Sequence, residues 1–128
     1  MLLIILSSLL WANEPKKKTT RRDVYKNRDH MRPKAIKKGE MLYRDLCWQC
    51  HGKQGMGDGP LSKALTSVPP PLAGMSSKKY SKMISIVQVG KGPMPAYAEL
   101  IDKHDSKKIL QWLSTLDSTT GEPKKASK

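Results

Sequence analysis

Large apolar side chains are scarce in this sequence. Its 128 residues include no phenylalanine, three tryptophans and four tyrosines. A chain of this length has room for one domain, and about 80 residues are marginal for a core made of side chains alone. No segment alternates apolar and polar residues as a half-buried strand does, so the sequence predicts an all-α domain. We therefore expect a small helical domain whose core needs apolar surface from a further source.

Cysteine is also scarce, which excludes several kinds of site. The only two cysteines, Cys47 and Cys50, are followed directly by His51. A zinc site needs four ligands, and the remaining histidines, His30 and His104, lie at no ligand-like spacing. A thioredoxin-like pair is typical of a βαβ pattern, which the sequence lacks, and a structural disulfide would not need the adjacent histidine.

The stretch Cys47-Trp48-Gln49-Cys50-His51 is the attachment signature of a c-type haem. Two thiols one helical turn apart form thioethers with the two vinyl groups of a porphyrin. The adjacent imidazole then lies beside the ring, as the proximal ligand of the iron. The motif predicts one haem c bound covalently through Cys47 and Cys50, and a buried porphyrin would supply the missing apolar surface.

Acidic residues are outnumbered, and the imbalance is uneven. The chain has 24 Lys and Arg against 11 Asp and Glu, a net charge of +13. Glu14 to Lys38 hold eleven of the basic and three of the acidic residues, so this stretch carries +8 and the remainder +5. Such basic runs bind nucleic acid, anionic membranes or acidic proteins, or are solvated linkers.

The N-terminal segment differs in composition from the rest. Residues Met1 to Ala12 are mostly apolar, too few to span a bilayer, and typical of a signal-peptide core that ends at a small residue. The usual positive n-region is missing, so we expect either a start further upstream or a short uncleaved anchor. Residues 13–32 are basic and polar without helical periodicity, which predicts a flexible linker.

Apolar residues recur at helical spacing in several later segments. Pro33 suits the first turn of a helix that runs to Leu46. Further helices are expected over residues 61–65, over 79–89 with Ser76 or Ser77 as the cap and Gly90 at the end, and after the N-cap Asp102. The last helix carries an apolar stripe of Ile109, Leu110, Trp112, Leu113 and Leu116. Residues 118–128 read as a basic, polar, mobile tail.

Two segments are predicted as loops. Residues 52–60 contain four glycines, and they are not a phosphate loop because the Lys-Ser/Thr ending is absent. Met94 lies between Pro93 and Pro95, so it cannot occupy a helix interior and is displayed on a stiff loop.

Together these pieces resemble a class I c-type cytochrome of the small bacterial monohaem kind, over residues 33–117. The resemblance rests on the haem motif and on four further stretches, which keep the family's order and separation. They are Lys38-Gly39-x-x-x-Tyr43, Gly57-Asp58-Gly59-Pro60, Pro70-Pro71-Leu72-Ala73-Gly74 and Gly92-Pro93-Met94-Pro95-Ala96-Tyr97, with the helix of Trp112 completing the pattern.

The resemblance implies a small cytochrome c fold, with about three to five helices around one covalent haem. It implies that the first and last helices cross, with Gly39 facing the aromatic Trp112. The family's proximal histidine donates its free ring N–H to a proline carbonyl, for which Pro70 matches best and Pro69 is possible. Leu72 resembles the leucine that packs on the porphyrin face.

The sixth iron ligand is a choice among methionines. Met94 matches the family's ligand position, so His51 and Met94 are the expected metal ligands. Met56 lies too near His51 in sequence to reach the opposite ring face easily. Met75 and Met83 are alternatives, although Met83 fits the apolar face of its own helix.

A His/Met-ligated haem has no open coordination position, so the resemblance implies a one-electron carrier and not an enzyme. A haem enzyme or sensor would need that position vacant.

The family is assembled outside the cytoplasm, so we expect export to the periplasm, free or tethered through the N-terminus. The alternative is a haem c subunit of a membrane-bound redox complex. We expect acidic redox proteins as partners and no nucleic acid, with docking through Lys53, Lys78, Lys79, Lys82 and Lys91.

Overall fold

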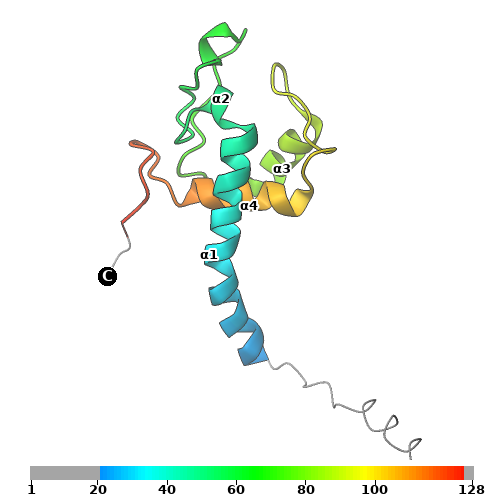
Figure 1. Cartoon of the computed structure of the whole chain (residues 1–128), viewed down its shortest axis with the longest axis vertical. Helices are drawn as coiled ribbons and strands as arrows, with labels where there is room; N and C mark the ends of the chain where they lie inside the picture. The colour runs from blue at the N-terminus through cyan, green and yellow to red at the C-terminus, as the bar shows by residue number, and fades with distance from the viewer. Residues whose placement is uncertain (1–20, 126–128) are drawn as a thin grey trace, which may run out of the picture.

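The computed structural model describes residues 21–125 of the chain, with side chains from Arg32 onward. Its helices are α1 (Arg21–Leu46), α2 (Trp48–His51), α3 (Tyr80–Val89) and α4 (Lys103–Ser114), with the 3₁₀ turns η1 (Ser62–Ala64) and η2 (Ser77–Lys79). This described part contains two isolated bridges and no strand, so the all-α prediction is confirmed (Figure 1). None of its helices has the length and apolar character needed to cross a bilayer. The predicted signal or anchor segment, Met1 to Ala12, lies outside the described residues.

The fold is built on the crossing of α1 and α4 (Figure 1). A Cβ atom added to Gly39 of α1 would overlap the carbonyl group of Lys108 in α4. One turn further along each helix, the rings of Tyr43 and Trp112 pack together with their centroids 4.8 Å apart. The predicted crossing is confirmed. The atoms nearest to Gly39 are the backbone of Lys108 and Ile109, while the aromatic Trp112 pairs with Tyr43.

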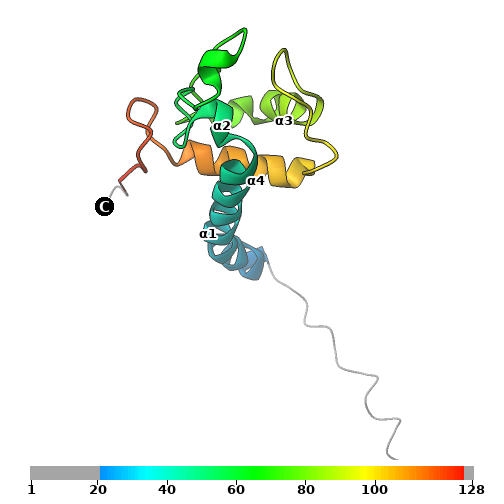
Figure 2. The same ribbon diagram turned by 45° about the horizontal axis from the view of Figure 1, so that its top comes forward.

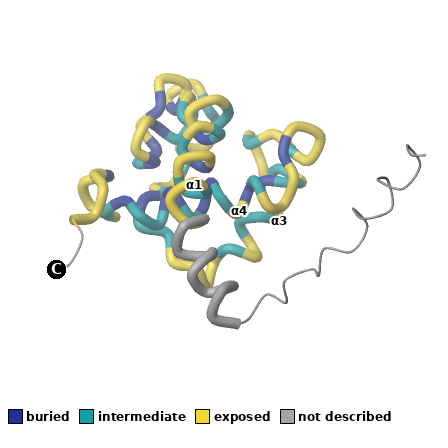
Figure 3. The backbone as a smooth tube through the Cα atoms, turned by 60° about the horizontal axis from the view of Figure 1, so that its bottom comes forward, coloured by how far each residue is buried: buried dark blue, intermediate teal, exposed yellow. Residues whose placement is uncertain are grey.

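Helix α4 contributes more residues to the core than any other element. The predicted apolar stripe is buried over Ile109, Leu110, Trp112 and Leu113 in α4 and Leu116 just after it. It is joined by Tyr43, Ala73, Val87 and Ile101 from neighbouring segments. In Figure 3, buried stretches of backbone lie in α4 and the elements beside it, and also in the glycine-rich loop that follows α2. The side chain of Asp102 accepts the amide of Asp105 at 2.7 Å, so the predicted N-cap is confirmed.

The prediction of a flexible linker up to Arg32 is wrong from Arg21 onward, because α1 begins there. Arginine and lysine are good helix formers, which favours a helix even without an apolar stripe. In Figures 1 and 2 the first turns of α1 extend away from the other helices, and a helix needs apolar periodicity only where it packs. Pro33 therefore lies inside α1, where it removes one backbone hydrogen bond, and does not begin the helix.

The prediction of a mobile tail after Asp117 is wrong for residues 118–125. The carboxylate of Asp117 accepts the amides of Thr119 and Thr120 at 2.8 and 3.0 Å, which turns the chain. The amide of Lys124 then donates to the carbonyl of Thr115 at 2.8 Å. Gly121 is buried in this turn, so the segment folds back onto the domain.

An ion pair joins α1 and α4 beside their closest approach. The carboxylate of Asp105 accepts from Lys38 of α1 at 2.8 Å and from Lys108 at 2.6 Å. The hydrogen bonds from Lys108 and then from Lys38 lower the pKa of Asp105 below its ordinary value of 3.8. The carboxylate is therefore more acidic in the folded chain than in the unfolded one.

Truncating the central aromatic should destabilise the domain strongly. Trp112 is 7% exposed, so we expect Trp112→Ala to lower the free energy of unfolding by about 3–5 kcal/mol, the usual cost of removing a buried aromatic. Chemical denaturation measures this. Leu100→Ala, at a side chain that is 68% exposed, is the control and should change stability by about 0.5 kcal/mol or less. A loss below about 1 kcal/mol for Trp112→Ala would contradict its central role in the core.

The ion pair predicts an acid-sensitive component of stability. Because the folded-state pKa of Asp105 is lowered, its contribution is complete above pH 3.8 and is lost as the pH falls through the folded-state value. Asp105→Asn should therefore lose less stability on acidification than the parent chain, in denaturation series between about pH 2 and pH 6. Asp45→Asn, at an exposed position of α1, should keep the parent profile. Equal acid sensitivity of the Asp105→Asn variant and the parent would show that the pair contributes nothing.

Candidate haem attachment site

The attachment motif begins where α1 ends. The amide of Cys47 donates to the carbonyl of Tyr43 at 2.9 Å, and the amide of His51 donates to the carbonyl of Cys47 at 3.0 Å. These bonds place Cys47 and Cys50 one helical turn apart, with both thiols free and half-buried. Burial, and then the neighbouring Cys50, raise the pKa of Cys47 to about 12. A spacing of one helical turn is the spacing of the c-type haem attachment motif.

His51 has the state that a metal ligand requires. Burial lowers its pKa, so the imidazole is neutral near pH 7. Its Nδ1 atom is buried and is the one side-chain nitrogen or oxygen in the described part of the chain that is buried without a hydrogen-bond partner. Native structures rarely leave such an atom unpaired without a functional cause. With Nδ1 enclosed by protein, Nε2 is the nitrogen available to an iron atom.

The predicted hydrogen bond from His51 to a proline carbonyl is not formed in this structure. Nδ1 of His51 has no partner, and Pro70 is exposed. The carbonyl of Pro69 packs instead against Gly57, whose amide donates to the carbonyl of His51 at 2.8 Å. Three successive prolines make the backbone stiff. The Pro69 carbonyl therefore cannot rotate on its own towards His51.

The loop after the motif is held by close backbone contacts. Gly55 has φ +72°, and a Cβ there would lie 2.8 Å from the Cδ2 atom of Leu113. Its carbonyl accepts the amides of Leu72 and Ala73 at 2.6 and 3.2 Å, which fixes the predicted porphyrin-facing leucine beside the loop. The hydroxyl of Tyr43 donates to the carbonyl of Gly52 at 2.7 Å. The central aromatic pair thus also anchors the loop that follows His51.

The Met94 loop is tied to the attachment motif. Lys91 and Met94 exchange backbone hydrogen bonds of 3.0 and 3.1 Å, which close a tight turn after α3. The hydroxyl of Tyr97 donates to the carbonyl of Leu46 at 3.0 Å, one residue before Cys47. Burial raises the pKa of Tyr97, with smaller contributions from the nearby thiols of Cys47 and Cys50. In the sequence, Tyr97 is only the last residue of a motif, and nothing there indicates that its hydroxyl binds the end of α1.

The other methionines differ in their surroundings. Met56 faces the C-terminal turn, since a Cβ added to Gly121 would lie 3.1 Å from its Cγ atom. Met75, Met83 and Met94 are all half-buried and pack against the core cluster. Of these three, Met94 is the one on a loop that is hydrogen-bonded to the end of α1.

The helices, the paired thiols and the buried imidazole define a c-type cytochrome domain. A family model described as "Cytochrome C oxidase, cbb3-type, subunit III" matches residues 34–113, and the chain belongs to this family. No curated protein and no solved structure matches the chain. The match confirms the resemblance to c-type cytochromes and supports a haem-based role in electron transfer. It implies covalent haem c, which the chain's own residues fit through Cys47, Cys50 and His51.

Covalent attachment is directly testable. When the chain is made in a host that attaches haem c, haem stain should remain with the polypeptide on a denaturing gel, because thioethers survive denaturation. Cys47→Ser/Cys50→Ser should lose the stain, while Cys50→Ser alone should retain it through one thioether. A parent band without haem stain would contradict the assignment.

Proposed function

We propose that this chain is a one-electron carrier with a haem c whose iron is bound by His51 and Met94. The main support for this proposal is the hydrogen bond from the Tyr97 hydroxyl to the Leu46 carbonyl. It holds the Met94 loop beside the attachment motif. When bound, the haem supplies Fe(III)/Fe(II) cycling. Ligation from both sides leaves no position for a substrate, so the chain passes an electron and is not an enzyme.

The protein's part is to hold the two ligands still. His51 is presented as a neutral imidazole by burial. Pro93 and Pro95 stiffen the loop on which Met94 is displayed. A thioether ligand favours the ferrous state and raises the potential relative to two histidines. A site that keeps its geometry in both oxidation states exchanges an electron with little rearrangement.

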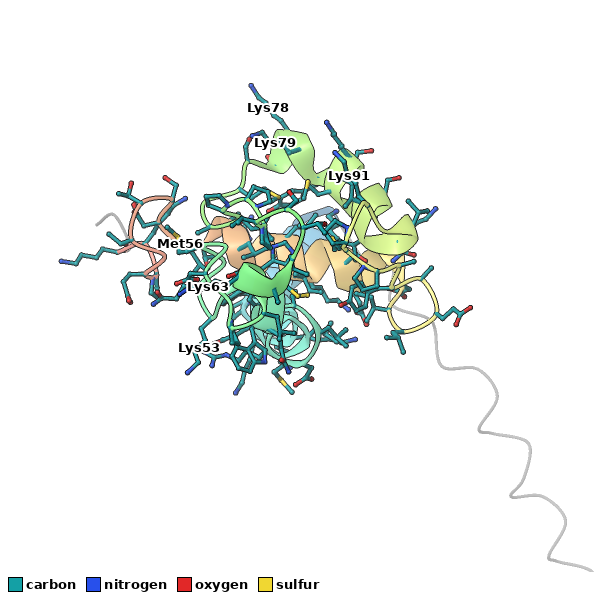
Figure 4. The ribbon with its side chains drawn as sticks, turned by 90° about the horizontal axis from the view of Figure 1, so that it is seen from above. Lys53, Met56, Lys63, Lys78, Lys79 and Lys91 are labelled. Atoms are coloured by element: carbon teal, nitrogen blue, oxygen red, sulfur yellow. The ribbon has the colours of Figure 1, made fainter. Side chains whose placement is uncertain are left out.

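The partner we propose is a redox protein with an acidic surface. The expected docking lysines, Lys53, Lys78, Lys79, Lys82 and Lys91, are all exposed, and none of them forms an ion pair in the described part of the chain. In Figure 4, Lys78 and Lys79 lie at one edge of the domain and Lys53 at the opposite edge, with Lys63 and Lys91 between them. A positive surface of this kind steers association with an acidic protein.

We place the chain in the periplasm, because c-type haem is attached outside the cytoplasm and residues 1–12 are typical of an export signal. The second candidate is a haem c subunit of a membrane-bound oxidase, which the description of the matched family favours. The two differ in where the native protein is found. A soluble carrier should appear in the periplasmic fraction, whereas a subunit should co-purify with its complex from membranes.

The ligand assignment predicts a spectroscopic change. The oxidised protein should show the weak band of sulfur-to-iron charge transfer at the red end of the visible spectrum. Met94→Ala should abolish this band and lower the reduction potential, because the thioether that favours ferrous iron is lost.

Met75→Ala and Met83→Ala are the matched controls, since both side chains are half-buried against the same core. Each should keep the band. Loss of the band in either control, with retention in Met94→Ala, would assign the ligand to the other methionine.

Docking through the lysines predicts a strong effect of salt. The second-order rate of electron transfer to an acidic redox protein should fall steeply as salt rises, because the Debye length shortens from about 10 Å at 0.1 M to about 3 Å at 1 M. Lys78→Gln/Lys79→Gln/Lys91→Gln should flatten this dependence. Deletion of residues 14–32 should leave it largely intact. A flat profile in the deletion variant would assign docking to the basic arm.

A further inference from the structure

A groove of about 880 Å³ lies between α3 and α4. Each helix contributes a row of side chains spaced by about one turn: Ser81, Ser85 and Gln88 from α3, and Lys103, Lys107 and Gln111 from α4. Its apolar surface comes from Tyr80, Ile84 and Val89. None of these residues belongs to the haem site, so the groove is a separate surface of the molecule.

Hydrogen bonds between the two walls keep the groove in shape. The hydroxyl of Tyr80 donates to the carbonyl of Leu110 at 3.0 Å. The side-chain nitrogen of Gln88 donates to the carbonyl of Ile101 and to the hydroxyl of Ser106, both at 3.0 Å. Because its nitrogen is used inside the protein, Gln88 has its Oε1 atom left for a ligand. These hydrogen bonds fix α3 and α4, the two walls of the groove, relative to each other.

The charge of the groove has one sign. Lys103 and Lys107 are exposed, and neither forms an ion pair within the part of the chain that the structure describes. No lining residue is acidic. The carboxylate of Asp105 on the same helix is bound by Lys38 and Lys108 instead. Two lysines without a carboxylate partner, facing a row of hydroxyls, suit a ligand that carries negative charges and hydrogen-bonding groups.

The spacing of the lysines restricts the shape of that ligand. Residues four apart on a helix are separated by about 6 Å along its axis. Alternate residues of an extended strand are separated by about 6.8 Å and point the same way. Acidic side chains at every second position of an extended segment would therefore match Lys103 and Lys107. The small side chains of Ser81 and Ser85 leave room for its backbone on the opposite wall.

We propose that the groove between α3 and α4 binds an extended segment of a partner protein with Asp or Glu at alternate positions. The carboxylates pair with Lys103 and Lys107, and the segment's backbone amides donate to Gln88 Oε1 and to the serine hydroxyls. Lys78, Lys79 and Lys82 lie on η2 and α3 beside the groove, so a partner anchored there would also be near these docking lysines. The proposal does not depend on which methionine binds the iron.

The test uses the full-length, haem-loaded chain in its reduced form and the peptide Glu-Ala-Glu-Ala-Glu, capped at both ends. Titration followed by amide NMR should shift the signals of Ser81, Ser85 and Gln111. Lys103→Gln/Lys107→Gln should weaken binding about tenfold, since each exposed ion pair contributes a modest factor. Lys34→Gln/Lys37→Gln is the matched control. It removes the same charge from two exposed lysines one turn apart on α1 and should bind as the parent does.

Three further outcomes would overturn the proposal. Equal weakening in the two double variants would show that the peptide senses only net charge. Equal binding of Ala-Glu-Glu-Glu-Ala, which has the same composition, would remove the spacing argument. Anionic lipid vesicles whose binding requires Lys103 and Lys107, with no peptide binding, would identify a membrane surface as the ligand. Unchanged haem spectra of the variants show that the fold is intact in each case.

Discussion

The close contact between Gly39 and the backbone of Lys108 determines how α1 and α4 are placed relative to each other. Only a residue without a side chain allows α1 and α4 to approach this closely. The approach brings Tyr43 against Trp112 one turn further on, with ring centroids 4.8 Å apart. Tyr43 in turn accounts for the position of the haem motif, since its carbonyl and hydroxyl bind the backbone on either side of that motif. The crossing and the haem site are therefore parts of one arrangement.

The same arrangement explains how a chain without phenylalanine keeps a core. More of its buried side chains come from α4 than from any other element, and few large ones come from the segment between α2 and α3. That segment is held by backbone contacts, such as the carbonyl of Gly55 with the amides of Leu72 and Ala73. Half-buried apolar groups, Leu72 and Met83 among them, line the rest of the core. A porphyrin attached at Cys47 and Cys50 would add apolar surface to a core of this kind.

The sequence was most informative where one residue type alone satisfies a geometric requirement. The two thiols with His51, the glycine of the crossing and the cap of Asp102 were all predictable, because each has one physical reason for its place. Periodicity failed for the start of α1, where no packing imposes an apolar stripe. It also failed after Asp117, because that turn depends on one carboxylate accepting two amides. The predicted hydrogen bond from His51 to a proline carbonyl was the third failure. Three successive prolines predict a rigid segment, but they do not predict the direction in which their carbonyl groups point.

The C-terminal turn lies outside the matched residues, yet it bears on the haem motif. The side chain of Gln54 donates to Glu122 at 2.6 Å, and the buried Gly121 lies against Gln54 and Met56. The loop that follows His51 is consequently held from three directions: by α1 through Tyr43, by the segment of Leu72, and by this turn. Each of these contacts limits the movement of the backbone that follows His51. The hydroxyls of Tyr43 and Tyr97 tie this loop and the Met94 loop to the end of α1, so the two segments share one support.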